Sequence, residues 1–182
     1  VGYGTISADG HSYTINNNWI IDNNGWSAQV SPDATGLGYK KTPHFDNGQD
    51  ASTVPAGTVS VTDPQDKTVK VYYDHDYEPV TPDHPHDGVD PSEYTKDVNE
   101  TVHYVYSDGT KAADDNVQTS KWSRTLTVDK VTGQLVPNGQ YTTEWAIAKG
   151  QPSEYSQVNS PVIKGYYANQ ANVPATKVTQ DD

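Results

Sequence analysis

Short alternating segments, each followed by a turn signal, run through most of this sequence and constrain its fold more than any other feature. Val, Thr and Tyr dominate these segments, as in VHYVY at 102–106, and such residues favour strands. Asp-Gly pairs, which favour tight hairpins, occur at 9–10 and 108–109. Helical periodicity is scarce, and the best candidate for a short helix is PSEYSQV, where Pro152 suits a first turn. The pattern predicts a strand-dominated protein.

The supply of core-forming side chains is small. Hydrophobic residues make up 32% of the chain, well below the roughly 45–50% of an ordinary globular domain. Tyrosine supplies 13 of the aromatic residues and phenylalanine only one. Because tyrosine packs its ring while its hydroxyl stays in water, it suits thin layers in which little is fully buried. We therefore expect two thin, strand-rich domains rather than one large core.

A proline-rich acidic stretch interrupts the strand pattern near the middle of the chain. EPVTPDHPHDGVDP, from Glu78 to Pro91, holds four prolines and no sustained apolar period. Such a composition favours an extended linker. The sequence therefore predicts a first domain at 1–77, a linker at 78–96 and a second domain at 97–182.

The charge of the chain excludes some partners. Its net charge is −12 and its pI is near 4.6. Nucleic acid and anionic membrane surfaces are bound through clustered Lys and Arg, so neither is expected as a partner. No stretch approaches the roughly 18 consecutive apolar residues of a membrane-spanning helix, so membrane insertion is not expected either. Cys is absent, which excludes disulfides, thiolate nucleophiles and sulfur metal sites.

Two parts of the sequence are similar to each other. Ser-Pro is followed by Gly-Tyr at Ser31–Tyr39 and again at Ser160–Tyr166, and a Val-Pro pair follows each, at 54–55 and 173–174. After the first pair comes VKVYYDHD at 69–76, whose alternation predicts a strand. The matches favour an internal repeat, and chance similarity of short motifs is the alternative.

Carboxylates and imidazoles gather around the expected domain boundary. Asp74, Asp76, Asp83 and Asp87 lie among histidines, and such groups can hold a divalent cation. The prolines between them prevent the helical spacing of one common class of zinc site. Ca²⁺ is therefore the cofactor that this pattern would suit, and the alternative is a solvated acidic hinge with no cofactor.

Two tryptophans of the first domain lie among amide and hydroxyl side chains. Aromatic rings can stack on sugars while amides bond to the sugar hydroxyls. The candidate ligand-binding residues are Trp19, Asn23, Asn24 and Trp26. The alternative is that both tryptophans form the small core of this domain.

The second domain contains a longer patterned region. SKWSRTLTVDKVTGQLVPNGQYTTEW, at 120–145, predicts two long strands joined around Asp129–Gly133. Alternation places Trp122, Leu126 and Val128 on one face of the first of these strands. Trp122 and Trp145 alternate with Thr, which favours a place in the core for both tryptophans.

Signs of catalysis are weak. The chain has no G-x-S-x-G nucleophile motif and no glycine loop with phosphate-binding spacing. Paired carboxylates carry little weight because 24 acidic residues make chance pairs common. The sequence predicts a protein without enzymatic activity, and a carbohydrate-active enzyme module is the alternative from another class.

Three of these motifs together resemble a known family. Val102–Ala112 (VHYVYSDGTKA), Arg124–Gly133 (RTLTVDKVTG) and Ser160–Tyr166 (SPVIKGY) are similar to the mucus-binding (Mub) repeat of surface adhesins from lactobacilli and related gut bacteria. The resemblance covers roughly 97–182. Residues 1–77 resemble the partner domain of that repeat less closely, through their Ser-Pro, Gly-Tyr and VKVYY segments.

The resemblance carries expectations about fold and function. It implies an α+β fold of two small ubiquitin-like β-grasp domains in an elongated arrangement. It also implies an extracellular repeat, with tandem neighbours, in a cell-wall-anchored protein of a Gram-positive bacterium. Mucin glycoproteins are the implied partners, with immunoglobulins for some members, and a passive spacer repeat is the rival interpretation. No binding residue is carried over, because the shared motifs are structural in character.

Overall fold

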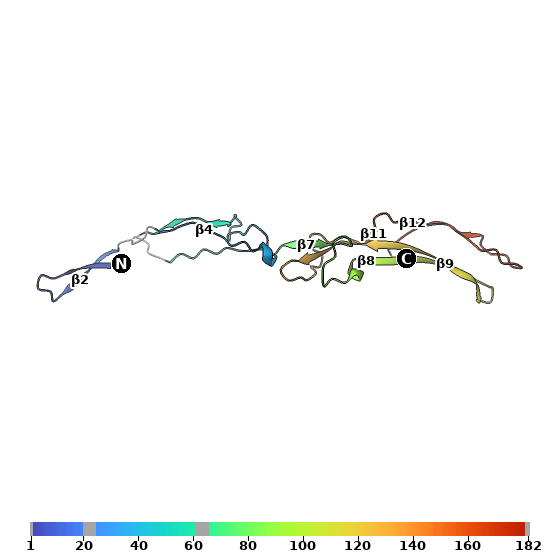
Figure 1. Cartoon of the computed structure of the whole chain (residues 1–182), viewed down its shortest axis with the longest axis horizontal. Coiled ribbons are helices and arrows are strands. Elements are labelled where there is room, and N and C mark those ends of the chain that lie inside the picture. Colours follow the sequence, from blue (N-terminus) through green and yellow to red (C-terminus); the bar gives the residue numbers. More distant parts are fainter. Residues whose placement is uncertain (1, 20–24, 61–65, 181–182) are drawn as a thin grey trace. The chain divides into compact units, whose positions relative to one another are not determined.

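The chain forms two compact units, each built from short strands. A computed structural model describes residues 2–19, 25–60 and 66–180, and the chain divides into Val1–Asp76 and Tyr77–Asp182 (Figure 1). In these ranges the helical segments are two 3-10 turns, η1 (Thr35–Leu37) and η2 (Pro91–Glu93). The predicted strand-dominated fold is confirmed. A β-grasp, which packs a mixed sheet against a helix, is not confirmed, because the strand pairs described are antiparallel.

The first unit opens with a hairpin. β1 (Gly2–Ile6) pairs with β2 (Tyr13–Trp19), with Ile6 opposite Tyr13. The turn is closed by a hydrogen bond from the Ser7 N–H to the Ser12 carbonyl oxygen, 2.9 Å. Asp9-Gly10 lies in this turn, as its sequence predicts.

A ladder of two short strand pairs follows in the first unit. Its strands are β3 (Gly25–Trp26), β4 (Gln29–Val30), β5 (Thr53–Val54) and β6 (Gly57–Thr58). β3 pairs with β6, and β4 pairs with β5. The backbones approach closely, since a Cβ at Gly25 would lie 1.9 Å from the Gly57 carbonyl oxygen. We call this element the N-terminal ladder.

The segment at 69–76 is extended but does not form the regular strand that its alternation predicts. Tyr72 bridges His44, and His75 bridges Tyr39. These two bridges are out of register with each other by two residues, and His44 also bridges Asp50. A continuous ladder therefore does not form, although the segment stays hydrogen-bonded to the chain around residues 38–44.

The second unit is organised around a long hairpin. β8 (Thr95–Val105) pairs with β9 (Lys111–Ser123), and β11 (Ala146–Ile147) adds to the other edge of β9. The Asp108-Gly109 turn joins the two long strands, and the Tyr106 N–H donates to the Thr110 carbonyl oxygen at 2.8 Å. This turn too lies where the sequence predicts it.

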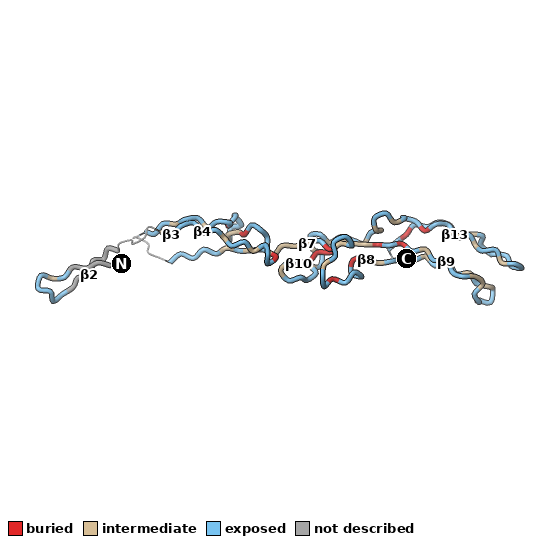
Figure 2. The backbone as a smooth tube through the Cα atoms, viewed as in Figure 1, coloured by how far each residue is buried: buried red, intermediate tan, exposed pale blue. Residues whose placement is uncertain are grey.

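Residues 78–96 are not the extended linker that their prolines predict. β7 (Tyr77–Val80) pairs with β10 (Leu126–Asp129). Val80, Val89 and Tyr94 are buried together with residues of β10. The stretch therefore belongs to the second unit (Figure 2). Pro79 is tolerated because it lies in a two-stranded sheet, where an edge position needs no N–H donor.

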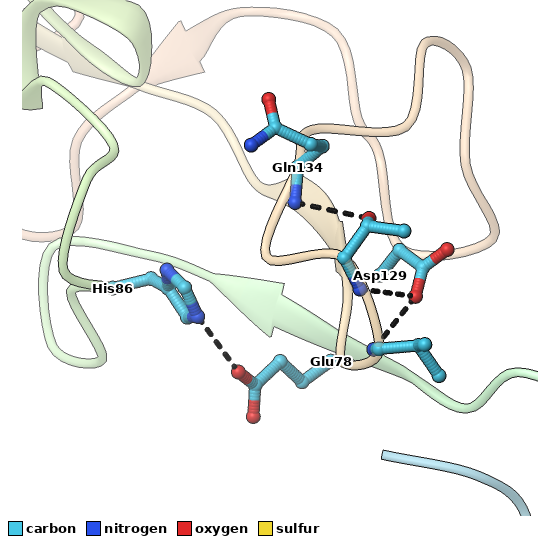
Figure 3. A network of polar contacts seen from close by, with 6 residues as sticks. Glu78, His86, Asp129 and Gln134 are labelled. Atoms are coloured by element: carbon cyan, nitrogen blue, oxygen red, sulfur yellow. Dashed lines mark hydrogen bonds and ion pairs between the residues drawn. The ribbon is translucent and has the colours of Figure 1, made fainter. Parts of the chain in front are cut away.

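The buried polar groups of β10 find partners. All four of its residues are buried, including Thr127 and Asp129. The Asp129 carboxylate accepts from the Val131 N–H at 2.8 Å and the Thr132 N–H at 3.3 Å (Figure 3). The same figure shows the ion pair between Glu78 and His86, 3.3 Å long. Val128 also bridges Leu135, but the long second strand expected after Gly133 is replaced by turns.

A second core cluster lies beside the hairpin. It consists of Val98, Trp122, Tyr155 and Val178, with Trp145 and Ile147 packed against it. The expected common face of Trp122, Leu126 and Val128 is therefore wrong. Strand pairing changes between β9 and β10, so Trp122 enters this cluster, whereas Leu126 and Val128 enter the other.

PSEYSQV forms strands instead of the predicted helix. β12 (Glu154–Tyr155), β13 (Val158–Asn159), β14 (Asn172–Val173) and β15 (Thr176–Lys177) build a second ladder, the C-terminal ladder. β12 pairs with β15, and β13 pairs with β14. Tyr155 is 4% exposed and packs in the core, and this burial outweighs the weak local helix signal.

The two ladders are copies of one structural element. Each ladder consists of two antiparallel strand pairs, and every strand is two residues long. Two unpaired residues separate the strand pairs on each side of the ladder, and the register is the same in both ladders. A Ser-Pro pair follows the second strand of each, and the Val-Pro pair begins inside the third strand. The similarity seen in the sequence thus corresponds to a repeated element of the structure.

Candidate functional site

The Ser-Pro and Gly-Tyr motif of the second unit forms a closed loop between β13 and β14. The Ser160 N–H donates to the Ala171 carbonyl oxygen at 2.9 Å, and its hydroxyl donates to the Gln170 carbonyl oxygen at 2.6 Å. Gly165 has a φ of +85°, a conformation that favours glycine. The loop therefore presents the tyrosines that follow Gly165 on its outside.

An open groove lies between this loop and the end of the long hairpin. The groove has a volume of about 560 Å³ and is lined by residues from 102–107 and 160–170. The rings of Tyr106 and Tyr166 meet across it, with centroids 4.6 Å apart. Tyr166 remains 61% exposed and Tyr167 is fully exposed. We call this surface the tyrosine groove.

The tyrosine groove is uncharged although the chain is strongly acidic. None of its lining residues is Asp, Glu, Lys or Arg. His103 lines it and pairs with Asp115 at 3.1 Å. Asn169 and Gln170 add amide groups beside the aromatic rings. Such a surface suits a ligand that meets it with apolar area and hydrogen-bonding groups rather than with charges.

No motif in the sequence predicts this groove. It lies between segments more than fifty positions apart, and no pattern in the sequence places those segments side by side. The one available signal was the pair of adjacent tyrosines, Tyr166 and Tyr167, directly after Gly165.

The predicted sugar-binding residues are only partly described. Asn23 and Asn24 lie outside the described residues, and Trp19 ends β2. Trp26 is 37% exposed, and the Lys67 ammonium lies 5.3 Å from the centroid of its ring. Its equivalent in the C-terminal ladder is Tyr155, which is buried. Trp26 therefore occupies a core position of the ladder that stays open in the first unit, and the four-residue site remains a prediction.

The four predicted calcium ligands are divided between the units. Asp74 and Asp76 belong to the first unit, whereas Asp83 and Asp87 belong to the second. Within the described ranges, no group of three or more His, Asp or Glu residues is placed to hold a metal ion. Calcium binding stays a prediction, tested by comparing the melting temperature in excess Ca²⁺ and in chelator.

Asp74 has a different partner in the structure. Its carboxylate lies 3.2 Å from the Nε2 atom of His44. The hydrogen bond of His44 to the Phe45 carbonyl oxygen, and then its bond to Asp74, raise the pKa of His44 above its ordinary value. This pair ties the 69–76 segment to the loop that it bridges.

Comparison with known proteins agrees with this architecture. The sequence pattern of the family described as Muc B2-like domain matches residues 89–182, just over half of the chain. No significant match was found among curated proteins. In the part of the chain that the structure describes, no helix is long and apolar enough to cross a membrane.

Two solved structures are similar to this chain. The type 2 repeat of the mucus binding protein MUB from Lactobacillus reuteri is 24% identical, with a TM-score of 0.50, over 98% of this chain and 90% of that one. A crystal structure of Mub-RV is 24% identical, with a TM-score of 0.49, over 86% of this chain and 80% of that one. The similarity to the type 2 repeat supports a shared fold. Since the family pattern covers more than half of the sequence, this chain belongs to the family of Muc B2-like domains.

Proposed function

We propose that this chain is a non-enzymatic repeat of a bacterial surface adhesin and that it binds mucus glycoproteins. The observation that carries the proposal is the family match over 89–182. The fold shared with the type 2 repeat of a mucus binding protein supports it. In this proposal the repeat lies outside the cell, in a wall-anchored protein of a Gram-positive bacterium, with tandem copies beside it and immunoglobulins as further partners.

We place the first glycan contact at Trp26. The indole ring is partly exposed, and Ser27 and Gln29 next to it are exposed hydrogen-bonding groups. Lys67 supplies a positive charge beside the ring. Mucin glycans that carry sialic acid or sulfate are anionic, so a local cation would offset the repulsion from a chain with a net charge of −12. The polar residues around Trp19 in the sequence, including Asn23 and Asn24, fit the same role.

A weak site of this kind suits a repeated protein. An exposed ring and a few hydrogen bonds bind a sugar weakly, because hydroxyl groups must give up water to bind. Linking several copies raises the overall affinity by roughly 10²–10⁴-fold without any new contact. The proposal therefore requires only modest affinity from one copy.

The test measures binding of the whole chain to immobilised mucin, both native and enzymatically deglycosylated. We expect binding to native mucin alone. Trp26→Ala should reduce that binding severalfold, and Lys67→Gln should reduce it mainly for sialylated or sulfated mucin. Tyr141→Ala is the matched control, since Tyr141 is 38% exposed but lies in the second unit.

Three outcomes would contradict the proposal. Equal binding to native and deglycosylated mucin would exclude glycan recognition. No binding by the wild-type chain to mucin or immunoglobulin would favour the passive spacer. Release of free sugar from mucin by the chain would show an enzyme instead.

A further inference from the structure

In the first unit, a neighbouring segment of the chain covers the Gly-Tyr motif. The Asp76 N–H donates to the Gly38 carbonyl oxygen at 2.9 Å, and the Lys40 N–H donates to the Asp74 carbonyl oxygen at 2.9 Å. The 69–76 segment thus adds as an extended strand beside residues 38–40. This arrangement satisfies backbone groups that would otherwise face water.

Aromatic contacts strengthen this cover. Tyr39 meets the ring of Tyr73 edge-on at 6.3 Å and the ring of His75 at 5.4 Å. The Tyr73 hydroxyl donates to the Pro32 carbonyl oxygen at 2.9 Å. The added strand therefore recognises both the Gly-Tyr and the Ser-Pro part of the motif.

The same motif recurs in the second unit with the same backbone form. Gly38 has a φ of +88° and Gly165 has a φ of +85°. Ser31 and Ser160 each donate a hydroxyl hydrogen bond to a carbonyl on the returning chain, to Ala51 and Gln170 respectively. The loop of the second unit is shorter, so the equivalence is limited to the Ser-Pro and Gly-Tyr residues themselves.

In the second unit this edge is open. Tyr166, the equivalent of Tyr39, meets Tyr106 on one side but stays largely exposed. Within residues 66–180, neither the Gly165 carbonyl oxygen nor the Tyr167 N–H has a hydrogen-bond partner. Pro161, Tyr166 and Tyr167 line the tyrosine groove. The groove therefore lies at the place that an added strand fills in the first unit.

We propose that the tyrosine groove is an acceptor site for an extended polypeptide strand of the 69–76 type, supplied by another copy of this repeat. The strand would donate an N–H to the Gly165 carbonyl oxygen and accept from the Tyr167 N–H. Its aromatic side chain would cover Tyr166, and its hydroxyl would reach the Pro161 carbonyl oxygen. This is strand addition to an exposed backbone edge, with side-chain pockets for specificity.

The charges fit such a partner. Two copies of a chain with a net charge of −12 repel each other, so a contact between them is favoured where charge is absent. The tyrosine groove has no Asp, Glu, Lys or Arg in its lining. The site binds polypeptide and does not depend on the proposed recognition of mucus glycoproteins.

The test adds a synthetic peptide of residues 67–77 (KTVKVYYDHDY), with blocked ends, to the isotope-labelled whole chain and follows backbone amide signals by NMR. We expect saturable shifts at Gly165, Tyr166 and Tyr167. Signals of Gly38 and Lys40 should not move, because their own strand is held in place at an effective concentration of roughly millimolar or more.

Two peptide variants distinguish backbone hydrogen bonding from nonspecific binding. Asp76→Pro removes the N–H that pairs with the Gly38 carbonyl oxygen in the first unit, whereas Asp76→Asn keeps it. We expect the proline peptide to bind roughly 3- to 10-fold more weakly, the value of one hydrogen bond, and the asparagine peptide to bind as well as the original.

Variants of the chain give the reciprocal test. Tyr167→Pro should weaken peptide binding by a similar factor, and Tyr167→Ala, which keeps the N–H, should weaken it less. Unchanged amide signals of β8 and β9 show that the variants are folded. If Tyr167→Pro does not fold, the comparison of the Asp76→Pro and Asp76→Asn peptides tests the backbone hydrogen bond instead.

The proposal is overturned if the peptide binds no better than a scrambled one, or if its shifts lie outside the tyrosine groove. It is also overturned if a neutral mucin oligosaccharide saturates the groove signals while the peptide does not. Mucin binding that persists when peptide binding fails would contradict this inference and leave the proposed function standing.

Discussion

At the scale of single residues, the stability of the second unit depends on a few fully buried positions. Val128 has no exposed surface and belongs to a small cluster with Val80, Val89, Tyr94 and Leu126. In so small a cluster, few neighbouring side chains can repack to fill the space left by a truncated one. All four residues of β10 are buried, so substitutions in this strand should be costly.

Val128→Ala should lower the free energy of unfolding by about 1.5–3 kcal/mol, because it removes two buried methyl groups and leaves a cavity. Val117→Ala is the matched control: Val117 lies on β9 but is 57% exposed, and its loss should cost under about 0.5 kcal/mol. Chemical denaturation of both variants measures the difference. Equal effects would show that the cluster around Val128 does not hold the unit together.

Turn carboxylates set the response of the chain to acid. The Asp108 carboxylate accepts a hydrogen bond from the Thr110 hydroxyl at 2.6 Å and another from the Thr110 N–H at 2.9 Å. These two bonds, the first having the larger effect, hold the pKa of Asp108 below its ordinary value of 3.8. The backbone N–H and hydroxyl of Thr35 do the same for Asp33, and Ser52 lowers the pKa of Asp50. A lowered pKa stabilises the folded chain above the unfolded pKa, and this contribution is lost as the pH falls through the folded pKa.

We therefore expect a melting temperature that changes little between pH 7 and 5 and falls below about pH 4. The combined variant Asp33→Asn, Asp108→Asn keeps an acceptor in each turn but cannot titrate there. Its melting temperature should fall less on acidification, as calorimetry at several pH values would measure. Identical falls in variant and wild type would assign the acid sensitivity to other groups.

At the scale of elements, one side chain joins the C-terminal ladder to the long hairpin. The Gln118 Oε1 atom accepts from the Ser156 N–H at 2.8 Å, and its Nε2 atom donates to the Ser156 carbonyl oxygen at 2.8 Å. The amide of Gln118 thus pairs with a backbone as another strand would. This contact holds β12 beside β9 and brings Tyr155 into the core.

Gln118→Ala should loosen the ladder by about 1–3 kcal/mol, since both hydrogen bonds to Ser156 are lost, together with the one to Glu100. Hydrogen exchange should speed up at Tyr155 and Lys177 while exchange within β7 and β10 stays slow. Gln157→Ala is the control, because among the described residues the Gln157 amide bonds only to nearby Asn159. Unchanged exchange in Gln118→Ala would mean that apolar packing and the hydrogen bond from Thr176 to Glu100 are enough to dock the ladder.

At the scale of the whole molecule, the net charge of −12 governs how the chain meets large anionic partners. Sialylated or sulfated mucin should be repelled over a distance set by the salt concentration. Raising the ionic strength from 0.01 to 0.15 M shortens the screening length from about 30 to about 8 Å. Binding to such mucin should therefore strengthen over this range. Neutral glycans on the same support are the control, and binding that weakens steadily with salt would contradict the expectation.

The sequence by itself determined the strand-dominated class and the tight turns, and it showed the similar motifs that mark the two ladders. These depend on local chemistry: Val, Thr and Tyr favour extended backbone, and the Asp-Gly pairs at 9–10 and 108–109 favour turns wherever they occur. The family was visible as well, because its motifs are contiguous. The site predicted around Trp26 rests on the same kind of local pattern, and it stays a prediction.

Only the tertiary structure decided which segments pair with which. β7 pairs with β10, although the two lie more than forty residues apart, and this contact turns a proline-rich stretch into part of a core. Burial of Tyr155 likewise overrides a weak local preference for helix. The tyrosine groove arises from two distant segments in the same way. Pairing between distant strands depends on the side chains that each finds opposite, and no local pattern in the sequence carries that information.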